Sequence, residues 1–309
     1  MSDRIPFRVK PMLATLTSAP FHRTRWVYEE KYDGYRILAY KEGARVTLLS
    51  RNDKDRTQSF ASIASAVAKL PARTLLLDGE VVAFDRHGVS RFQLLQRSAS
   101  AAHYAVFDCL YQNGRDLRRE PLAARRPALE KALGNTAKNA TIFVSARLAA
   151  NGLKAYEAAK RKGLEGLLAK DESAPYQSGR SNCWLKVKVR QEDEFIIVGY
   201  TAPGGSREHF GALLLGAHDR GRLRYVGKVG TGFTRETLAR LFRKFRPLIR
   251  TNPAVIDPPR EKDVTYLAPK LIAEIAYGEF THDGKLRQPA FLGLRDDKPA
   301  REVTVPEAK

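Results

Sequence analysis

The chain has 309 residues, of which 43% are hydrophobic and 28% charged, so it can bury cores and is not disordered throughout. This length predicts two domains, because one domain commonly takes roughly 100–200 residues. Two cysteines, Cys109 and Cys183, exclude a disulfide framework and a four-cysteine zinc site, and 54 basic against 34 acidic side chains give a net charge of +20.

The first part of the chain is predicted to be an α+β domain with mostly antiparallel strands. Apolar and β-branched runs predict strands over residues 26–31, 35–41, 45–50, 75–84, 104–111 and 167–170. An alanine-rich helix is predicted over 59–70, ended by Pro71, and a second over 153–162, stopped by Gly163.

After residue 190 the pattern changes to short strands at 195–200, 212–218, 223–229 and 272–277, separated by glycine-rich loops. One helix is predicted to start at Thr234. Its apolar positions with helical spacing are Leu238, Leu241, Phe242, Phe245 and Ile249. Several short strands and one helix predict a small five-stranded barrel of the OB type, so we place the domains at 1–190 and 191–309.

The positive charge is concentrated in the first domain. Residues 1–190 hold 34 basic and 18 acidic side chains, whereas residues 191–309 hold 20 and 16. This balance suits phosphate neutralisation on nucleic acid, although a basic surface also serves solubility alone. Apolar runs stay far below the ~18 residues of a membrane span, so we expect no membrane partner and a cytoplasmic, nucleoid-associated protein.

Six short segments carry the chemical information. They are Lys31-Tyr32-Asp33-Gly34-Tyr35-Arg36, Ser50-Arg51-Asn52, Asp78-Gly79-Glu80, Val106-Phe107-Asp108, Glu165-Gly166-Leu167-Leu168-Ala169-Lys170 and Trp184-Leu185-Lys186-Val187-Lys188. Taken alone, the first segment also fits an ordinary hairpin end. A lysine amine attacks a phosphoryl centre only when neutral, so we expect the pKa of Lys31 to be lowered by burial and by nearby cations. Lys186 and Lys188 alternate with apolar residues and therefore share one strand face.

These six segments, in this order and at this spacing, resemble the covalent nucleotidyltransferases: DNA ligases, RNA ligases and mRNA-capping enzymes. The resemblance is closest to bacterial ATP-dependent DNA ligases, namely the ligase domain of the ligase D and ligase C types. Three further segments match that subgroup. They are Lys10-Pro11-Met12-Leu13-Ala14, Tyr176-Gln177-Ser178-Gly179-Arg180-Ser181 and the terminal segment 286–298, in which Gln288 stands where relatives often have histidine.

The resemblance implies an adenylating nucleotidyltransferase domain followed by an OB-fold domain, with ATP carried as covalent AMP on Lys31 and with Mg²⁺ or Mn²⁺. The implied catalytic residues are Lys31, Lys186, Lys188, Arg295 and Asp297. The residues matched to nucleotide contacts are Glu29, Glu30, Lys31, Arg36, Arg51, Glu80, Phe107, Lys170, Arg180, Lys186 and Lys188. The residues matched to the metal are Glu165, Glu80 and Asp33.

Some of these residues also have ordinary structural explanations. Glu80 and Glu165 lie among apolar neighbours and could serve structural ion pairs. Phe107, implied to stack on adenine, fits core packing equally well. Arg295 and Asp297 are implied to swing over the ATP about a hinge near residue 190 and to orient the departing pyrophosphate, but they also fit a surface charge cluster.

The implied function is the sealing of 5′-phosphate/3′-hydroxyl breaks in nicked or broken duplex DNA, in repair or end joining, by a monomer that grips the backbone with both domains. An RNA ligase or a capping guanylyltransferase shares most of the motifs, and segment 286–298 argues against both. The alternative of another class is a non-catalytic DNA-end-binding protein, which the presence of Lys31 disfavours. The sequence leaves open whether a Ku-type end-binding protein or a separate polymerase module is a partner.

Overall fold

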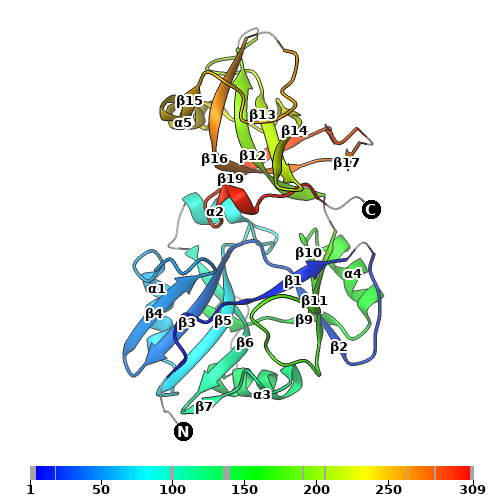
Figure 1. Cartoon of the computed structure of the whole chain (residues 1–309). Helices are drawn as coiled ribbons and strands as arrows, with labels where there is room; N and C mark the ends of the chain where they lie inside the picture. Colours follow the sequence, from blue (N-terminus) through cyan, green and yellow to red (C-terminus); the bar gives the residue numbers. More distant parts are fainter. Residues whose placement is uncertain are drawn as a thin grey trace. The chain divides into compact units, whose positions relative to one another are not determined.

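The computed structural model describes residues 5–17, 19–97, 101–134, 140–189, 191–204, 207–261, 263–281 and 283–306. The chain divides into two compact units, Met1–Arg190 and Gln191–Lys309. Both combine strands with a few helices, and most strand pairs are antiparallel, which confirms the predicted α+β class (Figure 1). In the described parts of the chain, no helix is long and apolar enough to cross a membrane.

One sheet of the first unit has the strand order β1-β11-β10-β2-β9. Its strands are β1 (Met12–Leu16), β11 (Gly179–Lys188), β10 (Gly166–Asp171), β2 (Trp26–Glu30) and β9 (Arg147–Ala149). Helix α4 (Gly152–Arg161) covers one face, where Ala155 joins Tyr28, Leu167 and Val187 in a buried cluster. The side chain of Asn151 starts this helix by accepting the backbone N–H groups of Leu153 and Lys154 at 3.0 and 3.2 Å.

The second sheet of this unit has the order β4-β3-β5-β6-β7, with β8 beside β6. Its strands are β4 (Arg45–Ser50), β3 (Tyr35–Glu42), β5 (Thr74–Val82), β6 (His103–Gln112), β7 (Arg115–Asp116) and β8 (Ile142–Val144). Helices α1 (Ala61–Ala68), α2 (Phe92–Arg97) and α3 (Leu122–Leu133) pack on one face, where they share a buried apolar cluster with the strands. On the other face, Leu76 and Phe107 pack with Met12 and Trp184 of the first sheet, so a core lies between the two sheets.

The predicted helices 59–70 and 153–162 correspond to α1 and α4, and the predicted strands correspond to β2–β6 and β10 with shifts at their ends. Among the strands of the first unit, the largest shift is at the end of β5, which stops at Val82 rather than at residue 84. In the second unit, the predicted strand 272–277 begins well after the start of the observed strand, Val264–Ala276. Helices α2 and α3 were not predicted, and α3 contains Pro127.

The second unit is a sheet of order β14-β13-β12-β16-β15 with β19 beside β16. Its strands are β12 (Glu192–Thr201), β13 (Leu213–Asp219), β14 (Arg222–Val229), β15 (Ile249–Arg250), β16 (Val264–Ala276) and β19 (Ala290–Arg295), with the small pair β17 (Glu279–Phe280) and β18 (Leu286–Arg287). A single apolar core holds these strands to helix α5 (Arg235–Phe245).

Helix α5 begins as predicted, because Thr234 accepts the backbone N–H of Thr237 at 3.1 Å. The prediction that Ile249 belongs to this helix is wrong. The helix ends at Phe245, a 3₁₀ turn follows over Arg246–Leu248, and Ile249 begins β15 with 53% of its surface exposed. Pro247 lies in this turn and has no backbone N–H to continue the helix.

Candidate active site

Lys31 lies in the short loop between β2 and β3, and the loop is fixed on several sides. The backbone N–H of Lys31 donates to Gly166 O of β10 at 3.1 Å. The backbone N–H of Asp33 donates to Ser90 Oγ at 3.0 Å, and Asp33 Oδ2 accepts the N–H of Phe92 at 2.9 Å. A Cβ atom at Gly34 would lie 2.1 Å from Val81 O, so only glycine allows this approach of β3 to β5.

The side chain of Lys31 forms an ion pair with Glu165, the residue immediately before β10. Burial lowers the pKa of Lys31, but Glu165, Asp33 and Glu80 raise it by more, so the net pKa lies above its ordinary value. The expectation of a lowered pKa is therefore wrong for this structure. The reason is that the carboxylates around the amine raise its pKa by more than burial lowers it.

The three carboxylates predicted to bind metal thus share the surroundings of Lys31. Glu165 Oε2 is buried and has no hydrogen-bond partner among the described residues, so one carboxylate oxygen is available to a cation. No three His, Cys, Asp or Glu side chains within the described parts of the chain come close enough to hold a metal by themselves. Magnesium commonly binds through one or two carboxylates plus phosphate oxygens and waters, so the donor set around Glu165 fits such an ion.

Arg36, at the start of β3, is held by Asp78 of β5. Its Nε and Nη2 donate to Asp78 Oδ1 and Oδ2 at 2.5 and 2.6 Å, and Tyr176 Oη donates to the same carboxylate at 2.6 Å. The bidentate pair raises the pKa of Arg36 despite its burial, so the guanidinium stays charged. Arg51 and Glu80 both lie beside Arg36. The backbone N–H of Arg51 donates to Arg36 O at 3.2 Å, and Glu80 is the cross-strand neighbour of Arg36 on β5.

Glu29 and Lys170 form a fully buried pair behind the Lys31 loop. Lys170 Nζ lies 2.7 Å from Glu29 Oε2, and it lies 4.4 and 4.5 Å from the ring centroids of Phe107 and Trp184. Burial lowers the pKa of Lys170 although Glu29 opposes this change. Phe107 is 3% exposed, and its ring meets the ring of Trp184 edge-on with 5.9 Å between the two centroids. It therefore packs in the core, and its stacking on adenine stays a prediction.

Lys186 and Lys188 lie on the face of β11 opposite to Leu185 and Val187, as the alternation predicts. They pair in register with Leu168 and Gly166, which brings Lys188 beside the strand that follows Glu165. The remaining nucleotide candidates differ in position. Glu30 is buried at the end of β2, whereas Arg180 is exposed near the start of β11 and donates to Ala14 O at 3.0 Å.

The two terminal candidates lie in the second unit, within a cluster of charges at the end of β19. Arg295 lies 3.0 Å from Asp297, 3.4 Å from Glu274 and 3.5 Å from Glu194, and Lys298 forms an ion pair with Glu194. Arg295 is therefore integrated into its own unit. The hinge predicted near residue 190 falls at Arg190, outside the described residues.

Three residues that support the site were given no role from the sequence: Asp78 and Tyr176, which lie within the motif segments, and Arg126, which lies outside them. Arg126 lies on α3 and donates to Glu29 Oε1 at 3.3 Å and to Ser145 O at 2.9 Å. Asp78 gives a usable signal, because a carboxylate inside an apolar strand needs a partner. Arg126 gives no such signal, since its helix was itself not predicted.

Comparison with known proteins identifies the family. Residues 11–188 match the family model described as the ATP dependent DNA ligase domain, and residues 206–298 match the ATP dependent DNA ligase C terminal region. The chain belongs to the ATP-dependent DNA ligase family. Its adenylation unit is followed by an OB-fold unit, as the resemblance implied.

Ligase D proteins are prominent among its relatives. The chain is 41% identical to the multifunctional non-homologous end joining protein LigD of Pseudomonas aeruginosa, over 97% of this chain and 37% of that protein. It is 36% identical to LigD of Mycolicibacterium smegmatis, over 95% of this chain and 39% of that protein. The chain thus spans less than two-fifths of the length of these relatives. A solved structure of mycobacterial DNA ligase D with ATP and MES is 32% identical with a TM-score of 0.75, covering 98% of this chain and all of that chain.

Proposed function

We propose that this chain is an ATP-dependent DNA ligase that seals 5′-phosphate/3′-hydroxyl breaks through a lysyl–AMP intermediate. The observation that carries the proposal is the Lys31–Glu165 pair, set among carboxylates and beside the cations of β11, in a chain of the DNA ligase family. No other lysine of the candidate site combines this position in a strand-end loop with this surrounding charge among the described residues.

In the first step Lys31 Nζ forms a bond to the α-phosphorus of ATP, and the bond from that phosphorus to pyrophosphate breaks. The ammonium must first lose a proton, and Glu165 Oε1 is the atom that accepts the hydrogen bond from it. AMP then passes from Lys31 to the 5′-phosphate of the break. The 3′-hydroxyl attacks that phosphate, and AMP leaves.

The side chains around Lys31 bind the phosphates, the metal ion and the nucleotide. Lys186 and Lys188 neutralise phosphate charge that builds up during the transfers. Glu165, with Glu80 and Asp33 nearby, would hold a divalent ion, Mg²⁺ or Mn²⁺, which would supply charge neutralisation at the phosphates. Arg36 stays fixed by Asp78 and presents its remaining guanidinium edge to the nucleotide.

Labelling with nucleotides radioactive at the α-phosphate tests the proposal. Incubation with labelled ATP gives a labelled protein that resists denaturation, whereas GTP and NAD give none. Lys31→Ala abolishes the label, and Lys160→Ala, an exposed lysine on α4, retains it. Lys31→Ala still binds nicked duplex DNA, because one charge among 54 hardly alters the electrostatic attraction. Label that persists on Lys31→Ala overturns the assignment of the nucleophile.

The same assay separates the alternatives. Labelling by GTP indicates a capping-type guanylyltransferase, and sealing of nicked RNA rather than DNA indicates an RNA ligase. DNA binding without any labelling indicates a non-catalytic end-binding protein. The ligase D relatives carry end joining in their names, so we place the activity in bacterial DNA repair or end joining, at the nucleoid.

A further inference from the structure

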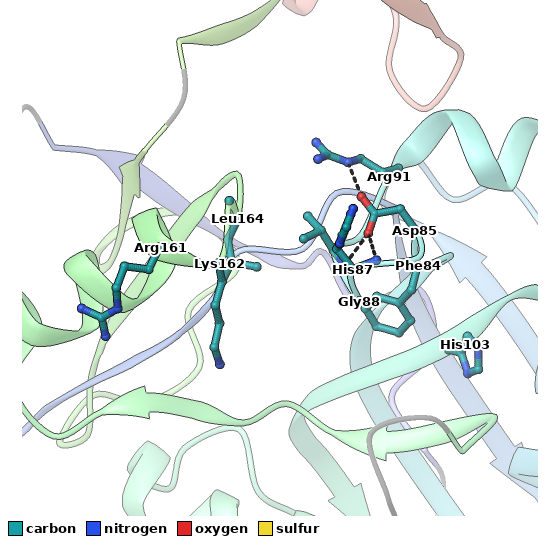
Figure 2. A pocket seen from close by; sticks show the side chains of 11 residues that line it. Phe84, Asp85, His87, Gly88, Arg91, His103, Arg161, Lys162 and Leu164 are labelled. Atoms are coloured by element: carbon teal, nitrogen blue, oxygen red, sulfur yellow. Dashed lines mark hydrogen bonds and ion pairs between the residues drawn. The ribbon is translucent and has the colours of Figure 1, made fainter.

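A cavity of about 880 Å³ opens in the first unit beside the Lys31 loop. It lies between the turn that follows β5 and the turn that joins α4 to β10. Figure 2 shows Arg161, Lys162 and Leu164 on one wall, and Phe84, His87 and His103 on the other. None of its described lining residues belongs to the candidate active site above. We call it the side pocket.

The apolar and aromatic lining of the side pocket, which we call its floor, comes from both walls and includes Phe84, His103, Val89 and Leu164. The ring centroids of Phe84 and His103 are 5.5 Å apart and tilted to each other. Val89 and Leu164 are buried in a small cluster with Ala159 of α4. Such a floor suits a flat, partly apolar group, because every nucleobase can stack on an aromatic ring.

The rim of the side pocket is cationic. Arg161 and Lys162 end α4, are exposed and make no ion pair within the described part of the chain. Asp85, the one carboxylate among the described lining residues, already accepts hydrogen bonds from its neighbours. It accepts the N–H groups of His87 and Val89 at 2.9 and 3.0 Å and Arg91 Nε at 3.2 Å (Figure 2). Cations at a helix C-terminus also interact favourably with the helix dipole. That interaction alone would not place them beside a cavity.

The side pocket is tied to the Lys31 loop on both of its walls. Ser90, within the turn after β5, accepts the backbone N–H of Asp33, and Phe92 donates to the Asp33 carboxylate. On the opposite wall, Leu164 directly precedes Glu165, the ion-pair partner of Lys31. A strand end presented to Lys31 therefore has the side pocket next to it.

We propose that the side pocket binds an unpaired nucleotide of a DNA end, with its base against Phe84 and His103 and its phosphate at Arg161 and Lys162. This inference rests on the proposed ligase function, which brings a DNA end to Lys31. The volume fits it, since pockets for small ligands commonly measure roughly 300–1,000 Å³. An aromatic floor with cations at its rim is the pattern by which proteins bind single-stranded nucleic acid.

Fluorescence anisotropy tests the proposal with labelled duplexes that end either blunt or in a short single-stranded overhang. The wild-type protein binds the overhang duplex more tightly than the blunt duplex of equal charge, and an abasic overhang loses that advantage. The double variant Arg161→Ala/Lys162→Ala binds the overhang duplex about tenfold more weakly and the blunt duplex with little change. Lys160→Ala on the same helix is the matched control and keeps the preference.

Phe84→Leu keeps an apolar side chain and removes the ring. This variant binds the overhang duplex more weakly than the wild type does. Its affinity for the abasic duplex is unchanged, because that duplex has no base to stack on the ring. Equal weakening of blunt and overhang duplexes by the double variant overturns the proposal, and so does a wild-type protein without preference. Reduced labelling of the double variant by ATP also overturns it, by assigning the pocket to ATP. Absence of labelling in the wild type refutes the ligase function itself, independently of the pocket.

Discussion

At the scale of single residues, the pKa of Lys31 differs in direction from the expectation based on the sequence. Burial and cations are both visible in the sequence, and both favour a neutral amine. The ion pair with Glu165 depends on how β2 and β10 pair, and it reverses the sign of the pKa change. The proposed nucleophile is therefore held in its charged form in this structure, so the proposed adenylation requires the release of this proton.

Glu165→Gln removes the carboxylate charge and keeps the size of the side chain. Since burial lowers the pKa of Lys31 and only Asp33 and Glu80 then oppose it, we expect this pKa to fall below its wild-type value. The neutral amine then appears at lower pH. The pH dependence of Lys31 acetylation, followed by mass spectrometry in the absence of ATP and metal, measures this shift. Glu157→Gln, exposed on α4, is the control, and overlapping curves for Glu165→Gln and wild type contradict the prediction.

Asp108 and Arg125 form a second ion pair, completely buried, with two contacts of 2.8 Å. Asp108→Asn leaves the guanidinium buried without its counter-charge, so we expect the free energy of unfolding of the first unit to fall by about 3–5 kcal/mol. Both tryptophans, Trp26 and Trp184, lie in this unit, so their fluorescence during urea denaturation reports on it alone. Glu157→Gln should change the same free energy by less than about 0.5 kcal/mol. A similarly small change in Asp108→Asn contradicts the assigned role.

At the scale of elements, the sequence predicts what depends on local patterns. The strands β2 and β3 follow from apolar runs, and the alternation in β11 correctly places Lys186 and Lys188 on one face. Helix α3 was not predicted because Pro127 interrupts the helical pattern of the sequence and because Arg125 is buried where an apolar residue is expected. Arg126, the site residue that α3 supplies, was missed for the same reason, whereas Arg36, Glu80 and Lys170 on predicted strands were singled out.

Arg126 on α3 gives a prediction about this element, because it fixes Glu29, a candidate nucleotide contact. We expect Arg126→Gln to raise the ATP concentration for half-maximal lysyl–AMP formation about tenfold, since a hydrogen bond to a charged group is lost. The rate at saturating ATP changes less. Glu130→Gln removes the 2.7 Å partner of Arg126 Nε without touching Glu29, so it serves as the matched control. A lower maximal rate at an unchanged ATP requirement contradicts this role.

At the scale of the whole molecule, the two units divide the charge unequally. The first unit holds 34 basic and 18 acidic side chains, whereas the second holds 20 and 16. The second unit uses part of its charge internally, in the cluster of Arg295 and Lys298 with Glu194, Glu274 and Asp297. The family resemblance implies that Arg295 and Asp297 belong to a mobile catalytic segment. The structure adds that any such movement carries the cluster as one piece.

The cluster decides which variant can test that role. Arg295 is 9% exposed and lies between Glu194, Glu274 and Asp297, so Arg295→Ala would unbalance buried charges and confuse catalysis with stability. Asp297 is 23% exposed, and Asp297→Asn leaves Arg295 with its two glutamates. We therefore expect this substitution to disturb the fold less than Arg295→Ala does.

We expect Asp297→Asn to slow lysyl–AMP formation about a hundredfold, because the resemblance assigns this segment to positioning pyrophosphate for departure, and misplacement costs rates of that order. The same variant should seal a nick that already carries a 5′-adenylate at a near wild-type rate, since pyrophosphate has left before that step. Rapid-quench assays with labelled ATP and with adenylated nicked DNA measure the two steps separately. The exposed neighbour Asp296→Asn is the control. Equal losses in both assays would instead assign the segment to folding or to DNA binding.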